Sequence, residues 1–501
     1  MSRTEEVGIV FGPASPEKIS FTARETVRVG EFLVAETADG PVLYMVVSFS
    51  NVSSILKAAM DYRTAEEARR ASQLNPRDRI REGVAKALGL IDELRKGRRI
   101  YPTVPPEPGS SVVLAESRLL SDIYCNRGER WAEIGHLLRR PEVRVSVNIN
   151  AIASRHLAVL AITGRGKSNF LTLLAKKVAE RNGTMVIIDY HSEYRDLKIS
   201  RLKVIEPKLN PRYLSAEELA DAIGVRAAAE KQRAMLGEVL DKDKGVRDAE
   251  NFWEALKKKL NKIAGSGDAK APDRYTATRL IEIIDRALRV WGPIFDLKAR
   301  NVLDQLFPNR INVLDVSEYT EAQAQILLSR LLEELLEDRK NAVRGDSDVR
   351  FRSPVIAAIE EAHLFVPSGK STSCSDIVAK IAREGRKFGL SLVLVSQRPS
   401  RLDSDVVSQM GSFAVSGLTH PRDQQFVMEV TDEVTEELRT GLPSLNPGEM
   451  ILVGSFVTAP CLVKIDLVEE KLIGRDIDAV SEWKKVSSEA PPYTTEELIR
   501  P

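Results

Sequence analysis

A glycine-containing loop between an apolar run and a helix-like run constrains this chain more than any other stretch. Leu157–Ile162 is apolar and has the length of a buried strand, and an apolar run with helical character opens at Asn169. A loop in this setting is suited to bind phosphate, because its glycines let backbone N–H groups converge on phosphate oxygens and the helix N-terminus adds partial positive charge. The sequence therefore predicts a nucleotide-binding loop made of Thr163, Gly164, Arg165, Gly166, Lys167, Ser168 and Asn169.

Two residues of this loop have distinct expected roles. Lys167 is expected to reach the β- and γ-phosphates, and the Ser168 hydroxyl is expected to ligate Mg²⁺. The common pattern G-x-x-x-x-G-K-[ST] has a glycine where this chain has Ala161, although Gly164 and Gly166 remain. The alternative is a surface Gly-Lys-Ser loop that happens to follow a buried strand.

Length and composition limit the classes of protein that this chain can be. Its 501 residues suggest about three domains, and a net charge of +1 excludes a uniformly basic nucleic-acid binder while still allowing a local basic channel. The three cysteines lie far apart, which argues against a zinc ribbon or a disulfide scaffold and favours a reducing cytosol. No apolar run approaches the roughly 20 residues that span a bilayer, and Met1–Glu6 does not begin a signal peptide. We therefore expect a cytoplasmic protein that does not enter a membrane.

Residues 1–150 are predicted to form a β-barrel domain with a helical excursion. Short runs of β-branched and aromatic residues fill residues 7–50, which is typical of a small barrel. Apolar residues in Arg79–Arg95 recur at helical spacing, so a helical excursion is expected at about 62–98. Two later strands are expected to complete the barrel, at residues 111–114 and 143–149.

From residue 151 to about 470, strand-like runs alternate with helix-like runs, which is typical of a parallel sheet covered by helices. The alternation stops at about 210–305, where helical periodicity predicts an inserted helical subdomain. Residues 471–501 are expected to form an extended C-terminal tail. The predicted fold class is therefore α/β, with a helical insert in the sheet domain and a β-barrel before it. The expected buried strands are Leu157–Ile162, Thr184–Ile188, Leu202–Ile205, Arg310–Leu314, Val355–Ile359, Leu390–Val395, Ser412–Ser416 and Met450–Phe456.

Two adjacent carboxylates follow the apolar run Val355–Ile359. The carboxyl ends of strands are where open α/β sheets bind ligands, and adjacent residues there point to different sides. We therefore expect Glu360 to belong to the Mg²⁺ shell and Glu361 to polarise the attacking water. Aspartate is usual at the first position, and two solvated glutamates at a strand end are the alternative.

The next apolar run, Leu390–Val395, is followed closely by Gln397. An amide can both donate and accept hydrogen bonds, so Gln397 is expected to sense the γ-phosphate or its water; a buried structural glutamine is the alternative. Arg383 and Arg386 lie before that run, at the edge of the predicted sheet. In a ring, either arginine could act in trans on the neighbour's nucleotide, whereas a solvated basic helix face is the alternative.

Taken together, the motifs resemble those of the archaeal HerA-type ATPases of the HerA–FtsK group. The resemblance covers nearly the whole chain. It rests on the motifs at residues 163–169, 188–194, 360–363, 383–387, 396–400, 418–423 and 445–450.

The resemblance implies a RecA-like P-loop ATPase core with ATP and Mg²⁺ as cofactors, preceded by a domain similar to the HAS-barrel of that family. It also implies a homo-hexamer around double-stranded DNA, ATP-driven translocation or unwinding, and partnership with a NurA-type nuclease in resecting DNA ends for recombinational repair. Arg155 resembles a basic residue that the family places near the phosphates, so we expect a catalytic role for it. Ala161 and Glu360 depart from the usual pattern.

Two other activities remain open from the sequence. One is a DNA-bound clamp or scaffold whose assembly is gated by nucleotide, and the other is a related motor that pumps DNA or protein. Candidate DNA contacts lie in the lysine-rich stretch Lys257–Lys270, with Trp253 and Tyr275 nearby, and at Lys370. Each of these is expected to bind phosphates without base specificity, or else to be a solvated surface.

Overall fold

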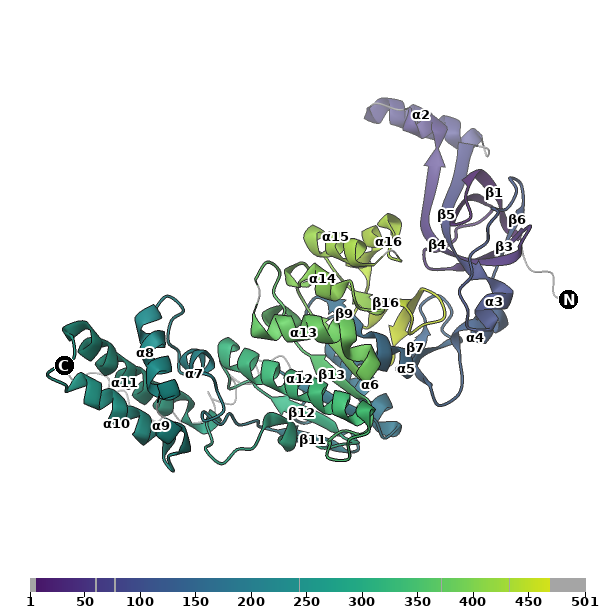
Figure 1. Ribbon diagram of the computed structural model, residues 1–501. Helices are drawn as coiled ribbons and strands as arrows, with labels where there is room; N and C mark the ends of the chain where they lie inside the picture. Colours follow the sequence, from purple (N-terminus) through teal and green to yellow (C-terminus); the bar gives the residue numbers. More distant parts are fainter. Residues whose placement is uncertain are drawn as a thin grey trace, which may run out of the picture.

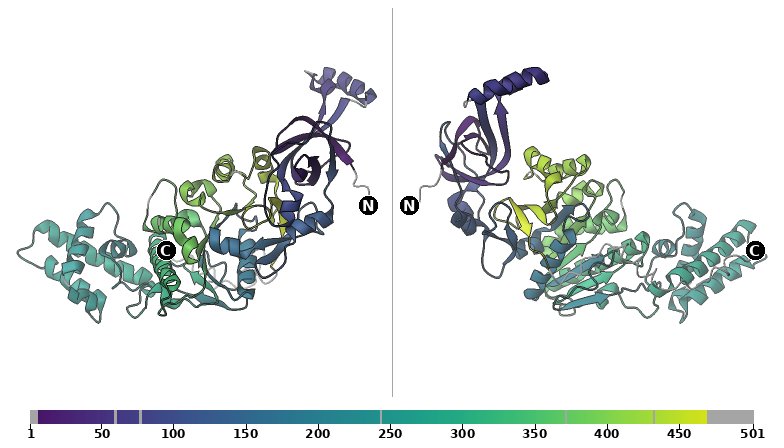
Figure 2. Two further views of the ribbon diagram at one scale, coloured as in Figure 1. Left: turned by 45° about the vertical axis from the view of Figure 1, so that its right-hand side comes forward. Right: turned by 180° about the vertical axis from the view of Figure 1, so that it is seen from behind.

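The structure, a computed structural model, describes residues 6–58, 61–75, 78–242, 244–370, 372–431 and 433–468. Figure 1 shows three parts, with a β-barrel at one end, a sheet-based domain in the middle and a helical subdomain at the other end. The two further views in Figure 2 show the same separation of barrel and helical subdomain by the central domain. The tail predicted at residues 471–501 lies outside the described residues.

The N-terminal barrel is closed, with the strand order β1-β2-β5-β4-β3-β6 and antiparallel pairing throughout. Large side chains fill its interior, among them Phe21, Leu33 and Tyr44, all fully buried. The predicted barrel is therefore confirmed. Its strands are β1 (Glu6–Ala14), β2 (Lys18–Ala23), β3 (Phe32–Thr37), β4 (Gly40–Ser53), β5 (Arg79–Leu90) and β6 (Ser111–Leu114).

The helix predicted within Arg79–Arg95 is wrong for most of its length, because residues Arg79–Leu90 form strand β5. Gly83, Ala85 and Ala87 are buried on one face of β5, at the spacing of two that a strand requires. A Cβ atom at Gly83 would lie 2.3 Å from the ring of Phe21, so only glycine leaves room for that ring. The larger apolar residues Ile80, Val84 and Leu88 happen to fall at helical spacing, whereas the buried small residues follow the spacing of a strand.

The helical excursion is confined to short helices around the barrel. Strands β4 and β5 extend beyond the barrel and carry helix α2 at their tip (Figure 1). Asp61 caps α2 by accepting a hydrogen bond from the backbone N–H of Thr64, at 2.8 Å. The helices of this region are α1 (Ser54–Lys57), α2 (Tyr62–Leu74), α3 (Ile91–Arg95) and α4 (Ser117–Tyr124).

The central domain contains an 11-stranded sheet with the order β11-β12-β10-β13-β14-β9-β15-β16-β17-β7-β8. The strands from β11 to β15 in this order pair in parallel, and those from β15 to β8 pair antiparallel. All eight predicted strands are present within one or two residues at their ends. The strands are β7 (Trp131–Leu137), β8 (Arg144–Asn148), β9 (Leu157–Ala161), β10 (Thr184–Asp189), β11 (Leu202–Ile205), β12 (Ile311–Asp315), β13 (Val355–Ile359), β14 (Leu390–Ser396), β15 (Ser412–Ser416), β16 (Glu449–Gly454) and β17 (Cys461–Ile465).

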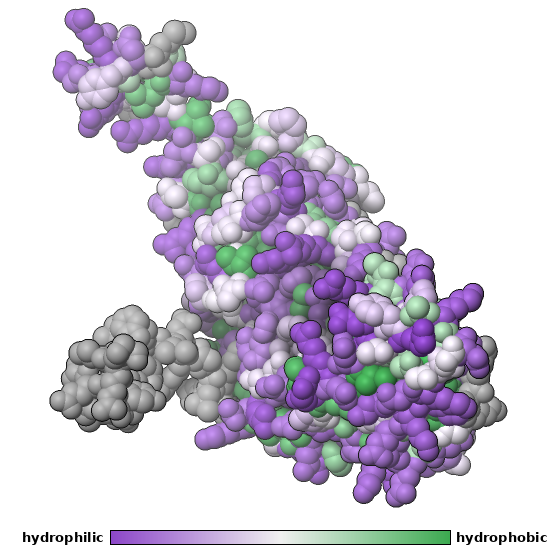
Figure 3. All heavy atoms as spheres, turned by 90° about the vertical axis from the view of Figure 1, so that its left-hand side faces the viewer, coloured by the Kyte–Doolittle hydropathy of each residue, from purple (hydrophilic) through white to green (hydrophobic). Residues whose placement is uncertain are grey.

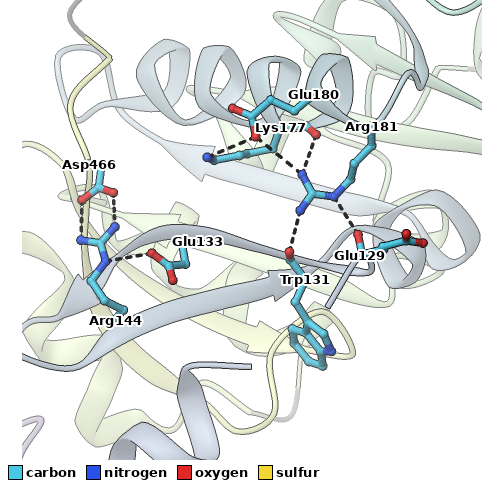
Figure 4. A network of polar contacts seen from close by, with 8 residues as sticks. All are labelled: Glu129, Trp131, Glu133, Arg144, Lys177, Glu180, Arg181 and Asp466. Atoms are coloured by element: carbon cyan, nitrogen blue, oxygen red, sulfur yellow. Dashed lines mark hydrogen bonds and ion pairs between the residues drawn. The ribbon is translucent and has the colours of Figure 1, made fainter. Parts of the chain in front are cut away.

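The strand predicted at 143–149 exists as β8, but it does not belong to the barrel as expected. It pairs with β7, which pairs with β17 at the end of the central sheet. Arg144 of β8 forms a bidentate ion pair with Asp466, which follows β17 (Figure 4). Residues 131–148 are therefore part of the central sheet, because the pairing of β7 with β17 and the ion pair of Arg144 with Asp466 attach them to the C-terminal end of the described chain.

Helices cover the sheet, and the long core formed by sheet and helices is continuous with residues of the barrel base. Within the described chain, no helix combines the length and the apolar character that crossing a membrane requires. The helices and 3-10 turns of this domain are α5 (Ile149–Arg155), α6 (Lys167–Glu180), η3 (Val302–Gln305), α12 (Glu321–Arg344), η4 (Ala362–Leu364), α13 (Ser373–Glu384), η5 (Gly385–Phe388), η6 (Pro399–Arg401), α14 (Ser404–Val407), α15 (Pro421–Val430), α16 (Glu436–Gly441) and η7 (Leu442–Ser444).

The helical insert has a hydrophobic core of its own, to which Phe252, Trp253, Leu256 and Leu280 belong. This agrees with the insert predicted at 210–305. Figure 3, viewed from the side of the insert, shows a largely hydrophilic face with scattered hydrophobic residues. Its elements are α7 (Ala216–Ala222), α8 (Glu230–Lys242), α9 (Lys244–Asp248), α10 (Phe252–Ala264), α11 (Ala271–Trp291) and η2 (Gly292–Ile294).

Candidate nucleotide site

The order of the parallel strands determines which loops meet at the carboxyl edge of the sheet. Strand β14 lies between β9 and β13, with Ser396 opposite Leu160 and Ile359 opposite Leu394, and β13 pairs with β10 on its other side. The segments that follow these four strands are therefore neighbours, although they are far apart in the sequence. This edge is where ligands bind in open α/β sheets.

The loop after β9 has the backbone of a phosphate-binding loop. Gly164 and Gly166 adopt φ values of 77° and 99°, which L side chains rarely reach. A Cβ atom at Gly166 would also lie 3.3 Å from the backbone of Gly448. Helix α6 begins at Lys167, so the N–H groups of its first turn face the loop and the partial positive charge of the helix is added there.

A cavity of about 690 Å³ opens above this loop, and it brings most of the predicted site residues together. The loop contributes its predicted members except Arg165, and the other parallel strands contribute both glutamates and Gln397. Its lining consists of Thr163, Gly164, Gly166, Lys167, Ser168, Asn169, His191, Glu193, Glu360, Glu361, Gln397, Pro447, Gly448, Lys464, Ile465 and Leu467.

Glu360 is deeply buried and hydrogen-bonded on one side only. Its Oε1 accepts a hydrogen bond of 2.8 Å from the phenol of Tyr194, while Oε2 has no hydrogen-bond partner among the described residues. Burial, with the nearby negative charge of Glu193, raises the pKa of Glu360 to about 8. The carboxylate is thus held in place by Tyr194 and forms no ion pair with a residue of the described ranges.

Glu361 occupies a left-handed backbone conformation, with φ 48° and ψ 43°, directly after β13. Such a conformation costs a non-glycine residue about 1 kcal/mol or more. It turns the carboxylate toward His363 Nδ1, at 3.3 Å, and His191 Nε2, at 3.8 Å. Burial raises the pKa of Glu361, and the charge of Lys167 opposes that shift. A buried carboxylate with a raised pKa beside a lysine has the properties of a general base.

The residues present fit a magnesium ion coordinated jointly with phosphate oxygens. Mg²⁺ prefers oxygen ligands and keeps several from water or substrate, so one or two protein oxygens are enough. The unpartnered Oε2 of Glu360 and the hydroxyl of Ser168 both belong to this cavity, and Tyr194 interacts with both residues. No group of three or more His, Cys, Asp or Glu residues in the described ranges could hold a metal by protein ligands alone.

Gln397 lies between the loop and the glutamates, where β14 ends. Its Oε1 accepts a hydrogen bond from the hydroxyl of Thr163. Ser396, one residue earlier, contacts His363 Nδ1 at 3.3 Å, and His363 in turn contacts Glu361. His363 therefore lies between Ser396 of β14 and the carboxylate at the end of β13, while Glu361 Oε2 accepts no hydrogen bond from a described residue.

The segment after β10 was overlooked as part of the site, although its sequence carried a signal. Asp189 is fully buried and accepts backbone N–H hydrogen bonds from Glu193 (3.0 Å) and Tyr194 (2.8 Å). This folds the segment back, so that Tyr194 reaches Glu360 while His191 and Glu193 line the cavity. A run of polar and aromatic residues directly after a buried strand, next to the glutamate strand, could have indicated this role.

Three predicted arginines lie at the opposite edge of the sheet. Arg155 precedes β9, and Arg383 and Arg386 precede β14, so all three are near the amino ends of these parallel strands. Their segments touch, because His156 Nε2 donates a hydrogen bond of 3.1 Å to the carbonyl of Ala382. All three side chains are exposed and form no ion pair with a described residue. The structure therefore does not bring them to the cavity of their own chain.

Arg165 and Asn169 have partners that the sequence did not suggest. The guanidinium of Arg165 donates to the carbonyl of Leu445, and it does not line the cavity. The amide of Asn169 binds the backbone of Asp466 and Val468. Both side chains attach the loop to the segment around β16 and β17.

The candidate DNA contacts differ in whether the structure leaves them accessible to a ligand. Trp253 is buried and contacts the rings of Phe252 and Phe295, so the expectation that it contributes to DNA binding is wrong. Lys257 pairs with Asp285 at 3.0 Å. Tyr275 is 66% exposed, and Lys370 lies in an exposed loop, so these two remain accessible.

Comparisons with known proteins agree with these observations. The family described as "Helicase HerA, central domain" matches residues 132–335. The "DNA double-strand break repair helicase HerA" of Saccharolobus solfataricus is 33% identical over 96% of this chain and 96% of its own length. The protein of the same name from Pyrococcus furiosus is 31% identical over 96% and 97%. Among solved structures, VirB4 of Thermoanaerobacter pseudethanolicus aligns with a TM-score of 0.49 and 16% identity over 69% of this chain and 99% of that chain.

Identity above 30% along essentially the full length of both chains cannot be produced by one shared motif. The aligned region includes the barrel, the sheet domain and the insert. The comparison therefore confirms the predicted family and the enzyme class of a helicase-type ATPase. The predicted fold class, a P-loop α/β core that follows a β-barrel, is confirmed as well. The chain therefore belongs to the HerA helicase family.

Proposed function

We propose that this protein is an ATP-driven, hexameric translocase and helicase of double-stranded DNA that acts in DNA end resection and recombinational repair. The observation that carries the proposal is the single cavity that contains Lys167 and Ser168 of the loop together with Glu360, Glu361 and Gln397. These groups come from three strands and have the chemistry that phosphoryl transfer to water requires.

The residues of the cavity divide the work of hydrolysis. The loop N–H groups and Lys167 bind the phosphates, and they stabilise negative charge that develops during transfer. Glu361 accepts the proton of the attacking water, and the ring of His363 lies beside its carboxylate. Gln397, through Thr163, connects the γ-phosphate position to β14. Mg²⁺, held by Ser168 and Glu360, would neutralise phosphate charge when bound.

The arginines at the amino edge support a ring. Arg155, Arg383 and Arg386 are exposed and lie away from the cavity of their own chain, so they are available to a neighbouring subunit. An arginine supplied in trans stabilises transition-state charge and makes hydrolysis depend on assembly. Double-stranded DNA as the substrate, a ring of six and a NurA-type nuclease partner are the assignments that family membership favours; the relatives are named as double-strand break repair helicases.

Hydrolysis and strand displacement test the proposal at the cavity. We expect Lys167→Ala to abolish ATP hydrolysis, and Glu361→Gln to bind ATP but lose turnover by a factor on the order of 10² to 10⁴. Glu333→Gln, an exposed glutamate on α12, is the matched control and should hydrolyse at the wild-type rate. Wild-type turnover by Glu361→Gln would contradict the assignment. A protein that binds duplex DNA and hydrolyses ATP but displaces no third strand would be a clamp and not a translocase.

Mixed rings test the trans arginines. Arg386→Ala and Lys167→Ala subunits should each be inactive alone, while a mixture should recover part of the activity, because the Lys167→Ala subunit supplies an intact arginine to its neighbour's intact cavity. Arg383→Ala and Arg155→Ala, mixed in the same way, identify which arginine acts. No recovery with any of the three would refute action in trans, and native mass measurement of the same samples gives the number of subunits.

A further inference from the structure

One wall of the nucleotide cavity lies where the carboxyl edge of the sheet continues past β15, at the start of β16 and the end of β17. Pro447, Gly448, Lys464, Ile465 and Leu467 all line the cavity. They come from the loop before β16, from β17 and from the residues that follow it. The phosphate loop, the segment after β10, the glutamates and Gln397 occupy the rest of the lining, so the wall is the part of the cavity with the fewest polar side chains.

The side chains of this wall are apolar except for one lysine. Leu467 is 68% exposed although it is a large hydrophobic residue beside a cavity, and Ile465 is buried next to it. Lys464 Nζ donates a hydrogen bond of 2.6 Å to the carbonyl of Pro447, which directs the ammonium along the wall. A single exposed leucine is ordinary at a protein surface, so its exposure is informative only because Leu467 also lines the cavity, where a flat apolar ligand would cover it.

Asn169 attaches this wall to the phosphate loop by two hydrogen bonds. Its Nδ2 donates to the carbonyl of Asp466 at 2.9 Å, and its Oδ1 accepts from the N–H of Val468 at 2.9 Å. The side-chain amide therefore pairs with the backbone on both sides of Leu467, as a neighbouring strand would. Leu467 is fixed over the cavity by a residue of helix α6 that directly follows Lys167 and Ser168.

A second attachment holds the same segment from the other side. The guanidinium of Arg144 on β8 binds both carboxylate oxygens of Asp466, and it also contacts Glu133 of β7 at 3.4 Å (Figure 4). The loop before β16 is attached as well, because Gly448 N–H donates to the carbonyl of Arg165 and Ile465 N–H donates to Gly448. Hydrogen bonds and an ion pair thus attach this wall to the phosphate loop, to helix α6 and to strand β8.

We propose that this wall, with Leu467 and Ile465 at its centre, is the platform for the nucleobase, and that Asn169 is the residue that positions it. The inference rests on the proposed function of the cavity as a nucleoside triphosphate site. An apolar platform accepts the face of any purine, and it offers no side-chain hydrogen bonds that match the edge of adenine. Discrimination between ATP and GTP is therefore weak, about tenfold or less, in contrast to the 10⁴ to 10⁵ of sites that hydrogen-bond a group that distinguishes their ligand.

Inorganic tripolyphosphate separates the platform from the phosphate loop, because it has the phosphates of ATP without the base. Dissociation constants for ATP, GTP and tripolyphosphate are measured by calorimetry on the full chain with Mg²⁺ present. We expect Asn169→Ala and Leu467→Ala each to raise the dissociation constants of ATP and GTP roughly tenfold, since burying one leucine side chain has an effect of about this size. The dissociation constant of tripolyphosphate should not change. Asn261→Ala and Leu74→Ala, an exposed asparagine and an exposed leucine elsewhere, are the matched controls and should change nothing.

Three results would overturn the inference. If Asn169→Ala raised the dissociation constants of ATP and tripolyphosphate equally, Asn169 would act only through the phosphate loop. If Leu467→Ala, which alters only an exposed side chain, bound ATP as the wild type does, Leu467 would not be part of a nucleobase platform. A preference for ATP over GTP of more than about 100-fold would require base-edge contacts that the wall does not have. Failure of the proposed function would look different, since the wild-type protein would then bind neither ATP nor tripolyphosphate.

Discussion

His156 connects the amino ends of β9 and β14 to helix α13, and its burial makes this connection sensitive to acid. The ring is 2% exposed; its Nδ1 accepts from the N–H of Leu392 at 2.9 Å, and its Nε2 donates to the carbonyl of Ala382 at 3.1 Å. Burial lowers the pKa of His156 from 6.5 to about 4. The neutral ring satisfies both partners, whereas the protonated ring would leave Leu392 N–H without an acceptor.

The sign and size of the effect follow from proton linkage. Because the folded state holds His156 neutral, the unfolded state binds more protons between pH 6.5 and 4, and the free energy of unfolding falls as the pH falls through that window. With these two pKa values, the contribution of His156 to the free energy of unfolding falls by about 2 kcal/mol between pH 7.5 and pH 5.

The variant His156→Asn isolates this contribution. Asparagine places an oxygen near the position of Nδ1 and does not titrate, so it keeps an acceptor for Leu392 and loses the bond to Ala382, at a pH-independent cost of about 1 kcal/mol. Urea unfolding of wild type and variant is followed at pH 7.5 and pH 5 by circular dichroism. Carboxylates such as Asp189 titrate equally in both proteins, so the difference between the two pH dependences should be about 2 kcal/mol. Identical pH dependences would refute the reasoning.

Two further substitutions examine the cavity. Gly166→Ala imposes a side chain at φ 99° and places a Cβ atom 3.3 Å from Gly448, so ATP affinity should fall about tenfold. Gly237→Ala on helix α8, where the nearest atom to a new Cβ is 3.6 Å away, should leave ATP affinity unchanged, and equal affinities of both variants would contradict the argument. Tyr194→Phe removes the donor to Glu360, so the Mg²⁺ concentration for half-maximal hydrolysis should rise about tenfold or more. Tyr275→Phe, at an exposed tyrosine, is its control, and an unchanged Mg²⁺ requirement would refute the role of Tyr194.

The sequence predicted the parallel strands and most of the cavity because both depend on local patterns. Each buried strand is a continuous apolar run; Glu360 and Gln397 directly follow two of these strands, and Lys167 ends the loop that follows a third, at the edge where ligands bind. The spatial order of the strands is not encoded locally. That order places Gln397 between the loop and the glutamates, and it places the segment after β10 beside Glu360.

Contacts between distant segments explain what the sequence did not predict. Strand β5 is not predicted because the ring of Phe21, about 60 residues earlier in the chain, packs against Gly83 of this strand. A helical pattern considers only neighbours within a few residues, so it cannot detect such a contact. The role of Asn169 depends on Asp466 and Val468, almost 300 residues later. Strands β7 and β8 join the central sheet through β17, so the boundary at residue 150 divides elements that are hydrogen-bonded to one another.

The two edges of the central sheet are the geometric basis for the proposal that an arginine acts in trans. The cavity lies beyond the carboxyl ends of β9, β13 and β14, while the exposed arginines lie near the amino ends of β9 and β14. Strand β9 has five residues and therefore separates the two edges by about 17 Å, more than an arginine side chain can bridge. A neighbour rotated about a common axis can present its amino edge to this carboxyl edge, and repeating that contact closes a ring. Hydrolysis in each cavity would then depend on the position of the next subunit, which is the coupling that a translocating ring needs.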